Sequence, residues 1–251
     1  MPSDPSRRPF LTAEWRNLAM LNYSVDPSWL AGRVPPGTEL DQFDGKTYVS
    51  LVAFRFLRTR IRGIWIPFHS DFDEVNLRFY VRRKHADTVR RGVVFVREVV
   101  PRYAIAKVAQ LAFHENYIAL RMRHRIVEPV SEYGRVQVEY GWRHAGQWNS
   151  VRVECEGRPT RAAEGSLEQF ITEHYWGYAA QPDGSSLEYQ VEHEPWRVWK
   201  PAIARFQGDT TGLYGEQLGA CLNRQPDSAF LADGSSVTVY SGERMGEGVD
   251  G

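Results

Sequence analysis

The stretch that decides the fold of this chain runs Asp73-Glu74-Val75-Asn76-Leu77-Arg78-Phe79-Tyr80-Val81-Arg82-Arg83. Apolar and polar side chains alternate along it, which is the period of a β-strand. A ligand pocket and a solvated outer face would both produce this alternation. The polar face lacks lysine and carries a carboxylate, an amide, a guanidinium and a phenol, groups that orient a ligand by directed hydrogen bonds. These residues are Glu74, Asn76, Arg78, Tyr80 and Arg82.

Most of the remaining chain also has strand character, with turn residues spread between the strands. The run 93–99 reads as apolar on both faces, which predicts a central, buried strand. Alternation at 117–127 and a turn at His144-Ala145-Gly146 predict an antiparallel meander. Further strand-like runs are 47–57, 104–111, 135–142, 148–155, 187–193 and 237–240.

Few helices are expected. Ser166 and Gln169 have the spacing of a capping box, and helical periodicity continues from Leu167 to Tyr178. This stripe includes His174, which is expected to be a hydrogen-bonded core histidine. Shorter helices are predicted at 28–32 and 215–223. The fold class is therefore α+β, predominantly antiparallel sheet, with helices packed outside.

The composition limits the class of protein. Hydrophobic residues make up 42% of the 251 residues and the formal net charge is zero, which argues against a nucleic-acid binder. No run approaches the roughly 20 apolar residues of a membrane span, and the start lacks the apolar core of a signal peptide. We expect a cytoplasmic protein with a disordered tail at 1–9 and one domain at 10–251. Cys155 and Cys221 have no metal-ligand spacing and are expected in the core.

A second candidate segment runs Phe113-His114-Glu115-Asn116-Tyr117. It is an exposed turn or, if buried, a place where Glu115 acts as a general acid or base. His69, Asp71 and Asp73 alternate, but three polar residues before a strand usually form a loop. No metal site and no cofactor are predicted.

The strand Phe72–Val81 resembles the signature strand of the YqjF-like family of uncharacterised proteins. Other stretches agree with this resemblance across most of 10–241. They are Trp15–Asp26 with Leu30 and Pro35, Leu40–Gly45 with the strand after it, Ser166–Tyr175, and His193-Glu194-Pro195-Trp196.

That family is similar in fold to acetoacetate decarboxylase. The resemblance implies a closed, cone-like antiparallel β-barrel with helices outside and a pocket within, and a possible homo-oligomer. Glu74 matches a pocket glutamate of the decarboxylase pattern. The decarboxylase motif Phe-Pro-Lys-Lys has its best match at Phe113–Asn116, where Glu115 and Asn116 replace both lysines. The Schiff base that these lysines serve is therefore not expected at this position.

Only four lysines occur, at Lys46, Lys84, Lys107 and Lys200, so amine chemistry has few candidates. Lys107 is the one that could restore it. Lys107 stands where the YqjF-like pattern usually has arginine, which favours a charge role.

Three functions remain open from the sequence. The first is a binding protein for a small acidic or carbonyl compound, with Arg78 or Arg82 holding the anion and Asn76 and Tyr80 orienting it; Asn116 and Lys107 are further candidate ligand contacts. The second is an enzyme of the lyase, hydratase or isomerase type, in which Glu74 and Glu115 share acid–base work. The third is a structural or interaction protein with a filled barrel.

Overall fold

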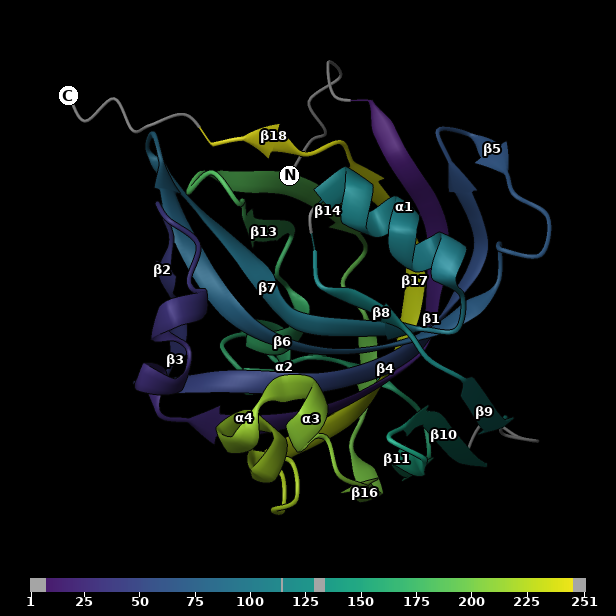
Figure 1. Cartoon of the computed structure of the whole chain (residues 1–251). Coiled ribbons are helices and arrows are strands. Elements are labelled where there is room, and N and C mark those ends of the chain that lie inside the picture. The colour runs from purple at the N-terminus through teal and green to yellow at the C-terminus, as the bar shows by residue number, and fades with distance from the viewer. Residues whose placement is uncertain (1–7, 114, 129–133, 246–251) are drawn as a thin grey trace.

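A computed structural model describes residues 8–113, 115–128 and 134–245 (Figure 1). The larger of its two sheets is built on seven main strands, each paired with the next. Two pairings within the described residues are parallel, that of β7 (Thr88–Val100) with β13 (Trp176–Ala180) and that of β7 with β8 (Tyr117–Ala119). The others are antiparallel. The first and last strands of this series, β17 and β14, also pair with each other, so the strand pairings form a ring. In that order the strands are β17 (Ser228–Tyr240), β1 (Pro9–Val25), β4 (Lys46–Ile61), β6 (Phe72–His85), β7 (Thr88–Val100), β13 (Trp176–Ala180) and β14 (Ser186–His193).

Short strands attach to this sheet, and a second sheet has the order β16-β11-β10-β9. The short strands are β2 (Glu39–Leu40), β3 (Gln42–Phe43), β5 (Ile64–Trp65), β8 (Tyr117–Ala119), β12 (Thr160–Arg161), β15 (Arg197–Trp199) and β18 (Glu243–Arg244). The second sheet comprises β9 (Met122–Val127), β10 (Arg135–His144), β11 (Gln147–Glu156) and β16 (Pro201–Gln207). The helices are α1 (Tyr103–Phe113), α2 (Leu167–Thr172), α3 (Thr211–Tyr214) and α4 (Glu216–Cys221), with 3₁₀ turns at Pro27–Trp29 and Ala31–Arg33.

The decisive strand β6 is buried on both faces. Every residue from Phe72 to Val81 is buried, including those of the polar face. Leu77 and Phe79 join the largest apolar cluster, which β4 and β7 also supply. The solvated-face interpretation is therefore excluded for Glu74, Asn76 and Arg78. Arg82 lies beyond the buried stretch, where its Nε donates to Glu39 at 2.7 Å.

A β-bulge interrupts the β6–β7 ladder. Leu77 is paired with Arg97, but the next residue, Arg78, is paired with Phe95, so Val96 has no opposite residue. An extra residue in one strand reverses which of its side chains point to a given face. Glu98 therefore lies opposite Asn76 on the inner face, while Arg97 lies opposite Leu77.

Two of the predicted strands differ in the structure. The run 104–111 belongs to helix α1, which is consistent with the high helix propensity of its alanine, lysine, glutamine and leucine residues. The predicted strand 117–127 is broken at Leu120 and Arg121, where the chain passes from one sheet to the other. The amide of Leu120 donates to Val100, whereas the carbonyl of Arg121 accepts from Arg143.

The predicted helix 167–178 begins as expected but ends early. Ser166 caps α2 by accepting from the amide of Gln169. The helix stops at Thr172, and the chain becomes strand β13 because its backbone pairs with β14. The predicted helix at 215–223 is α4, which Gly215, at φ +86°, separates from α3.

Other local predictions are confirmed. Ala145 and Gly146, both at positive φ, form the two-residue turn of the β10–β11 hairpin. Asp26 caps the turn that follows it. Cys155 and Cys221 are buried and unbridged. No described helix combines the length and apolarity needed to cross a membrane.

Candidate functional site

A cavity of about 190 Å³ lies on the inner side of the larger sheet, between β1, β4, β6, β7, β14 and helix α1. Its walls are mainly aromatic and aliphatic. Ala104 and Val108 of α1 line the cavity and are also exposed, so it reaches solvent at this helix. The apolar walls include Phe10, Leu11, Trp15, Leu18, Val52, Phe54, Phe56, Phe72, Val93, Phe95, Phe113, Trp176, Val191, Trp196 and Val239.

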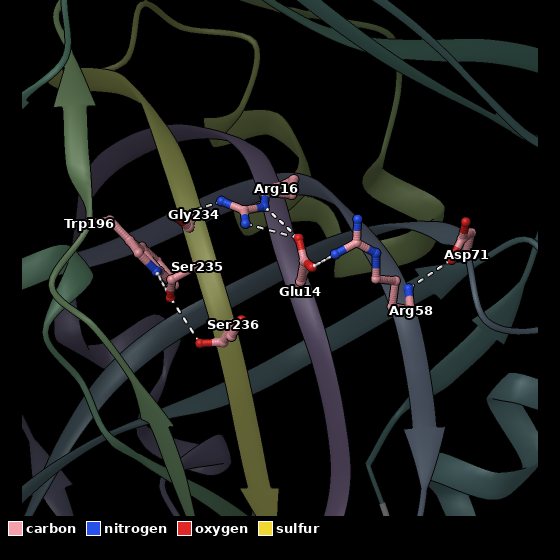
Figure 2. A network of polar contacts seen from close by, with 8 residues as sticks. All are labelled: Glu14, Arg16, Arg58, Asp71, Trp196, Gly234, Ser235 and Ser236. Carbon is pink, nitrogen blue, oxygen red and sulfur yellow. Dashed lines mark hydrogen bonds and ion pairs between the residues drawn. The ribbon is translucent and has the colours of Figure 1, made fainter. Parts of the chain in front are cut away.

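Trp196 is held in this wall from outside by β17. Its Nε1 donates to Ser235 Oγ at 3.0 Å, and its ring lies 6.1 Å from that of Trp15. Figure 2 shows this contact beside two ion pairs of Glu14, one with Arg16 of the same strand and one with Arg58, which joins β1 to β4. The aromatic wall is thus fixed by polar contacts that lie outside the cavity.

The polar residues of the cavity form one cluster. Strand β6 contributes Glu74, Asn76 and Arg78, and β7 contributes Glu98. The chain after α1 contributes Glu115 and Tyr117. The remaining members are Thr172, His174, Tyr189 and His193, and Thr59 and His69 also line the wall. Among the described residues that line it, this largely apolar space therefore contains three carboxyl groups and a single guanidinium.

Glu74 is fixed by two neighbours. Asn76 Nδ2 donates to its Oε1 at 2.9 Å, and the hydroxyl of Tyr117 donates to Oε2 at 3.5 Å. Burial raises the pKa of Glu74 to about 7, although these hydrogen bonds and the charge of Arg78 oppose the rise. Because its pKa lies near neutrality, this carboxyl can exist in either protonation state.

Glu115 faces the same cavity as Glu74. It is buried, and the hydroxyl of Tyr189 donates to its Oε1. Burial raises its pKa to about 8, the Tyr189 hydrogen bond opposes the rise, and the charge of Glu74 adds to it. The exposed-turn interpretation is therefore wrong for Glu115, whereas His114 lies outside the described residues.

Glu98 was not singled out by the sequence. The run 93–99 reads as apolar, yet Glu98 is 1% exposed and lines the cavity. Burial raises its pKa well above the ordinary value, and the charges of Glu115 and Glu74 add to the effect. A charged residue inside an otherwise buried strand is a signal that could have identified Glu98, but which face it occupies depends on the bulge.

Arg78 has unused hydrogen-bonding capacity. One terminal nitrogen donates to the carbonyl of Ile171 at 3.2 Å, while the buried Nε has no hydrogen-bond partner within the described residues. An unpaired buried donor is costly, so a ligand that accepts from it gains affinity.

Two histidines complete the polar surface. Burial lowers the pKa of both His174 and His193 to about 4, so both rings are neutral at pH 7. His174 Nε2 lies 3.4 Å from Asp41, which confirms the predicted core histidine although it follows α2 rather than belonging to it. His193 stacks on Trp196 with ring centroids 4.2 Å apart.

The structure brings four of the predicted site residues together and leaves three outside the wall. Glu74, Asn76, Arg78 and Glu115 line the cavity. The hydroxyl of Tyr80 lies 2.6 Å from Ser50 Oγ, and its ring packs against Phe170 and His174. Asn116 Nδ2 donates to Val96 at 3.1 Å, and Lys107 is exposed above the ring of Tyr103.

His69, Asp71 and Asp73, which alternate in the sequence, each contact a different partner. His69 Nδ1 lies near the carbonyl of Pro67, Asp71 accepts from the amide of Arg58, and Asp73 contacts His124. Within 8–113, 115–128 and 134–245, no group of three or more His, Cys, Asp or Glu side chains could hold a metal ion.

Comparison with known proteins confirms the resemblance. A family model described as uncharacterized conserved protein, DUF2071, matches residues 12–236. The uncharacterized protein YqjF of Bacillus subtilis (strain 168) is 27% identical over 187 residues, covering 72% of each chain.

Solved structures share the fold. Acetoacetate decarboxylase from Legionella pneumophila superposes with a TM-score of 0.66 at 12% identity, covering 98% of this chain and 92% of that one. The enduracididine biosynthesis enzyme MppR, complexed with pyruvate, gives 0.65 at 14% identity, covering 97% and 91%. At these identities the likeness shows an acetoacetate-decarboxylase-like fold and nothing about the reaction.

Proposed function

This chain belongs to the DUF2071 family, and from the chemistry of its cavity we propose that it binds a small organic acid that carries a carbonyl group and an apolar body. The observation that carries the proposal is Arg78. It is buried, it is the only arginine or lysine among the described residues that line the cavity, and its Nε has no hydrogen-bond partner among the described residues. A guanidinium in this setting is suited to hold a carboxylate.

The size and walls of the cavity support a small ligand. A cavity of about 150 Å³ accommodates benzene, so about 190 Å³ suits a molecule of roughly six to ten non-hydrogen atoms. The aromatic walls would bury its hydrocarbon part. The ring of strand pairings around this space supports the closed barrel that the resemblance implies. The pyruvate bound by the structural neighbour MppR is an acid of the same class.

Schiff-base chemistry is not part of the proposal. All four lysines are exposed, and no lysine is found among the described residues that line the cavity. The groups available to a carbonyl compound are therefore carboxyls, tyrosine hydroxyls and neutral histidines. This chemistry supports recognition of the carbonyl oxygen by hydrogen bonding rather than by covalent attachment.

The proposal is tested with 4-methyl-2-oxopentanoate, which combines a carboxylate, a ketone and a branched apolar end. Arg78→Ala is expected to weaken its binding roughly 10- to 100-fold, the range of a hydrogen bond to a charged group. Isothermal titration calorimetry at pH 7 measures this change. Arg82→Ala, on the same strand but in an exposed ion pair with Glu39, is the matched control and should bind normally.

The uncharged ketone 4-methylpentan-2-one separates anion binding from packing. Its affinity should not depend on Arg78, because it has no carboxylate. Arg78→Lys should recover part of the affinity for the acid, since it keeps the charge but loses the planar fork. An Arg78→Ala variant that binds the acid as tightly as the wild type would show that Arg78 is not the anchor.

Acid–base catalysis is a second candidate, favoured by the raised pKa values of Glu74 and Glu115. At pH 7 Glu74, with a pKa of about 7, is partly ionised and can act as a base. Glu115, with a pKa of about 8, is mostly protonated and can act as an acid. Carboxyls whose pKa values differ in one cavity are suited to move a proton next to a carbonyl group.

Exchange of the C3 protons of 4-methyl-2-oxopentanoate in D₂O, followed by NMR, tests this candidate. The wild type should accelerate exchange over the Glu74→Gln variant by roughly 100-fold or more, with a maximum between pH 7 and 8. Equal rates for both proteins, with the acid bound, would leave binding as the function.

A further inference from the structure

Glu98 is a buried carboxyl that no cation neutralises within the described part of the chain. It lines the cavity at 1% exposure, and its Oε2 has no hydrogen-bond partner among the residues that the structure describes. A buried ionised carboxylate normally requires a positive partner. The absence of one here indicates that Glu98 is held in its protonated form.

The surroundings of the Glu98 carboxyl agree with this state. Glu74 on β6 and Glu115 after α1 are both acidic and both oppose ionisation of Glu98. Tyr117 on β8 and Tyr189 on β14 are both close enough for their hydroxyls to interact with the Glu98 charge. The cation of the cavity, Arg78, interacts with Glu74 instead. A protonated carboxyl with a free oxygen is a hydrogen-bond donor of the kind that can stabilise a carbonyl oxygen.

The bulge in β7 sets the position of this donor. It places Glu98 opposite Asn76, and Arg78 is two residues further along β6. Two residues of a strand span about 7 Å, so Glu98 and Arg78 can contact neighbouring parts of one small ligand. Bulges often re-aim a side chain next to a functional site.

We propose that Glu98 donates a hydrogen bond from its protonated carboxyl to the carbonyl oxygen of the ligand, while Arg78 holds the carboxylate. This assignment rests on the proposed function and names the residue that recognises the carbonyl group of its ligand. It makes Glu98 the residue that distinguishes an oxo acid from the corresponding acid without the ketone oxygen.

The test compares 4-methyl-2-oxopentanoate with 4-methylpentanoate, which lacks only the ketone oxygen. The wild type is expected to prefer the oxo acid by about five- to tenfold, the contribution of one buried hydrogen bond. Glu98→Leu should reduce this preference to about one while still binding both acids through Arg78. Glu98→Gln, which keeps a donor of nearly the same shape, should retain a preference of severalfold.

The outcomes separate the two proposals. If neither acid binds the wild type, the proposed function fails and the assignment of Glu98 fails with it. If both acids bind and Glu98→Leu keeps the preference, only the assignment of Glu98 is wrong.

Infrared spectroscopy tests the protonation state without a ligand and without the leucine variant. The difference spectrum between the wild type and Glu98→Gln at pH 7 should contain the carbonyl stretch of a protonated carboxyl group. A difference spectrum that shows only the bands of an ionised carboxylate would overturn the assignment.

Discussion

The double variant Glu74→Gln/Glu115→Gln is expected to be more stable than the wild type above pH 8, by about 5 kcal/mol in the free energy of unfolding. The folded-state pKa values are about 7 and about 8, against 4.5 in the unfolded chain, and each unit of difference corresponds to about 1.4 kcal/mol. The separate shifts sum to about 8 kcal/mol, but the two carboxyls repel each other and their effects overlap, so the expected total is smaller.

The sign follows from proton binding. Between pH 4.5 and pH 8 the folded protein binds more protons at these two sites than the unfolded chain does. The stability of the wild type therefore falls as the pH rises through this window. Glutamine is neutral throughout, so the variant loses most of this slope and differs little from the wild type near pH 4.5.

Urea denaturation at pH 5, 7 and 9 measures the effect. In thermal denaturation at pH 9, the same gain in stability should raise the melting temperature by roughly 10–20 °C. Glu164→Gln, at an exposed position, is the control and should follow the wild type. A wild-type stability that is constant from pH 5 to pH 9 would show that Glu74 and Glu115 titrate normally in the folded protein.

The second large effect is expected at Gly234, in β17 opposite Arg16 of β1. Its φ is +82°, and a Cβ there would lie 1.9 Å from the carbonyl oxygen of Trp15. Gly234→Ala must therefore separate two paired backbones as well as adopt a left-handed conformation. The expected cost is about 4 kcal/mol or more, at the upper end for single substitutions.

Gly146→Ala is the matched control for this prediction. Gly146 has nearly the same φ, +83°, but nothing lies within 4 Å of its Cβ position. Its substitution should cost about 1 kcal/mol, from backbone strain alone. Figure 2 shows why relaxation at Gly234 is limited, since its carbonyl also accepts from Arg16 at 3.2 Å. Equal losses in the two variants, measured by urea denaturation, would mean that β1 and β17 can move apart at little cost.

The candidate site was predictable from sequence where one strand supplied it. Alternation along β6 placed Glu74, Asn76 and Arg78 on one face, and the structure places all three in the cavity wall. Tyr80 shares that face, but at its position the space is filled by Phe170 and His174. Periodicity gives the face of a strand and not the depth of the cavity behind it.

Elements whose ends depend on long-range pairing were less predictable. The cap of α2 is local, so Ser166 identified where this helix begins. The end of α2 depends on the pairing of β13 with β14, and the local periodicity of the sequence carries no information about that pairing. The strand-like run at 104–111 was too short for its apolar pattern to separate strand from helix.

The amino-acid sequence by itself determined the two-faced strand at 73–83, because local alternation of side chains is a property of that segment alone. It also determined that lysine chemistry is absent from the Phe113–Asn116 motif. Only the tertiary structure decided that Glu98 faces the cavity and Arg97 does not. The reason is the single extra residue at Val96, whose place is set by the register with β6. That register is set by contacts between β6 and β7, so it cannot be read from the sequence of either strand alone.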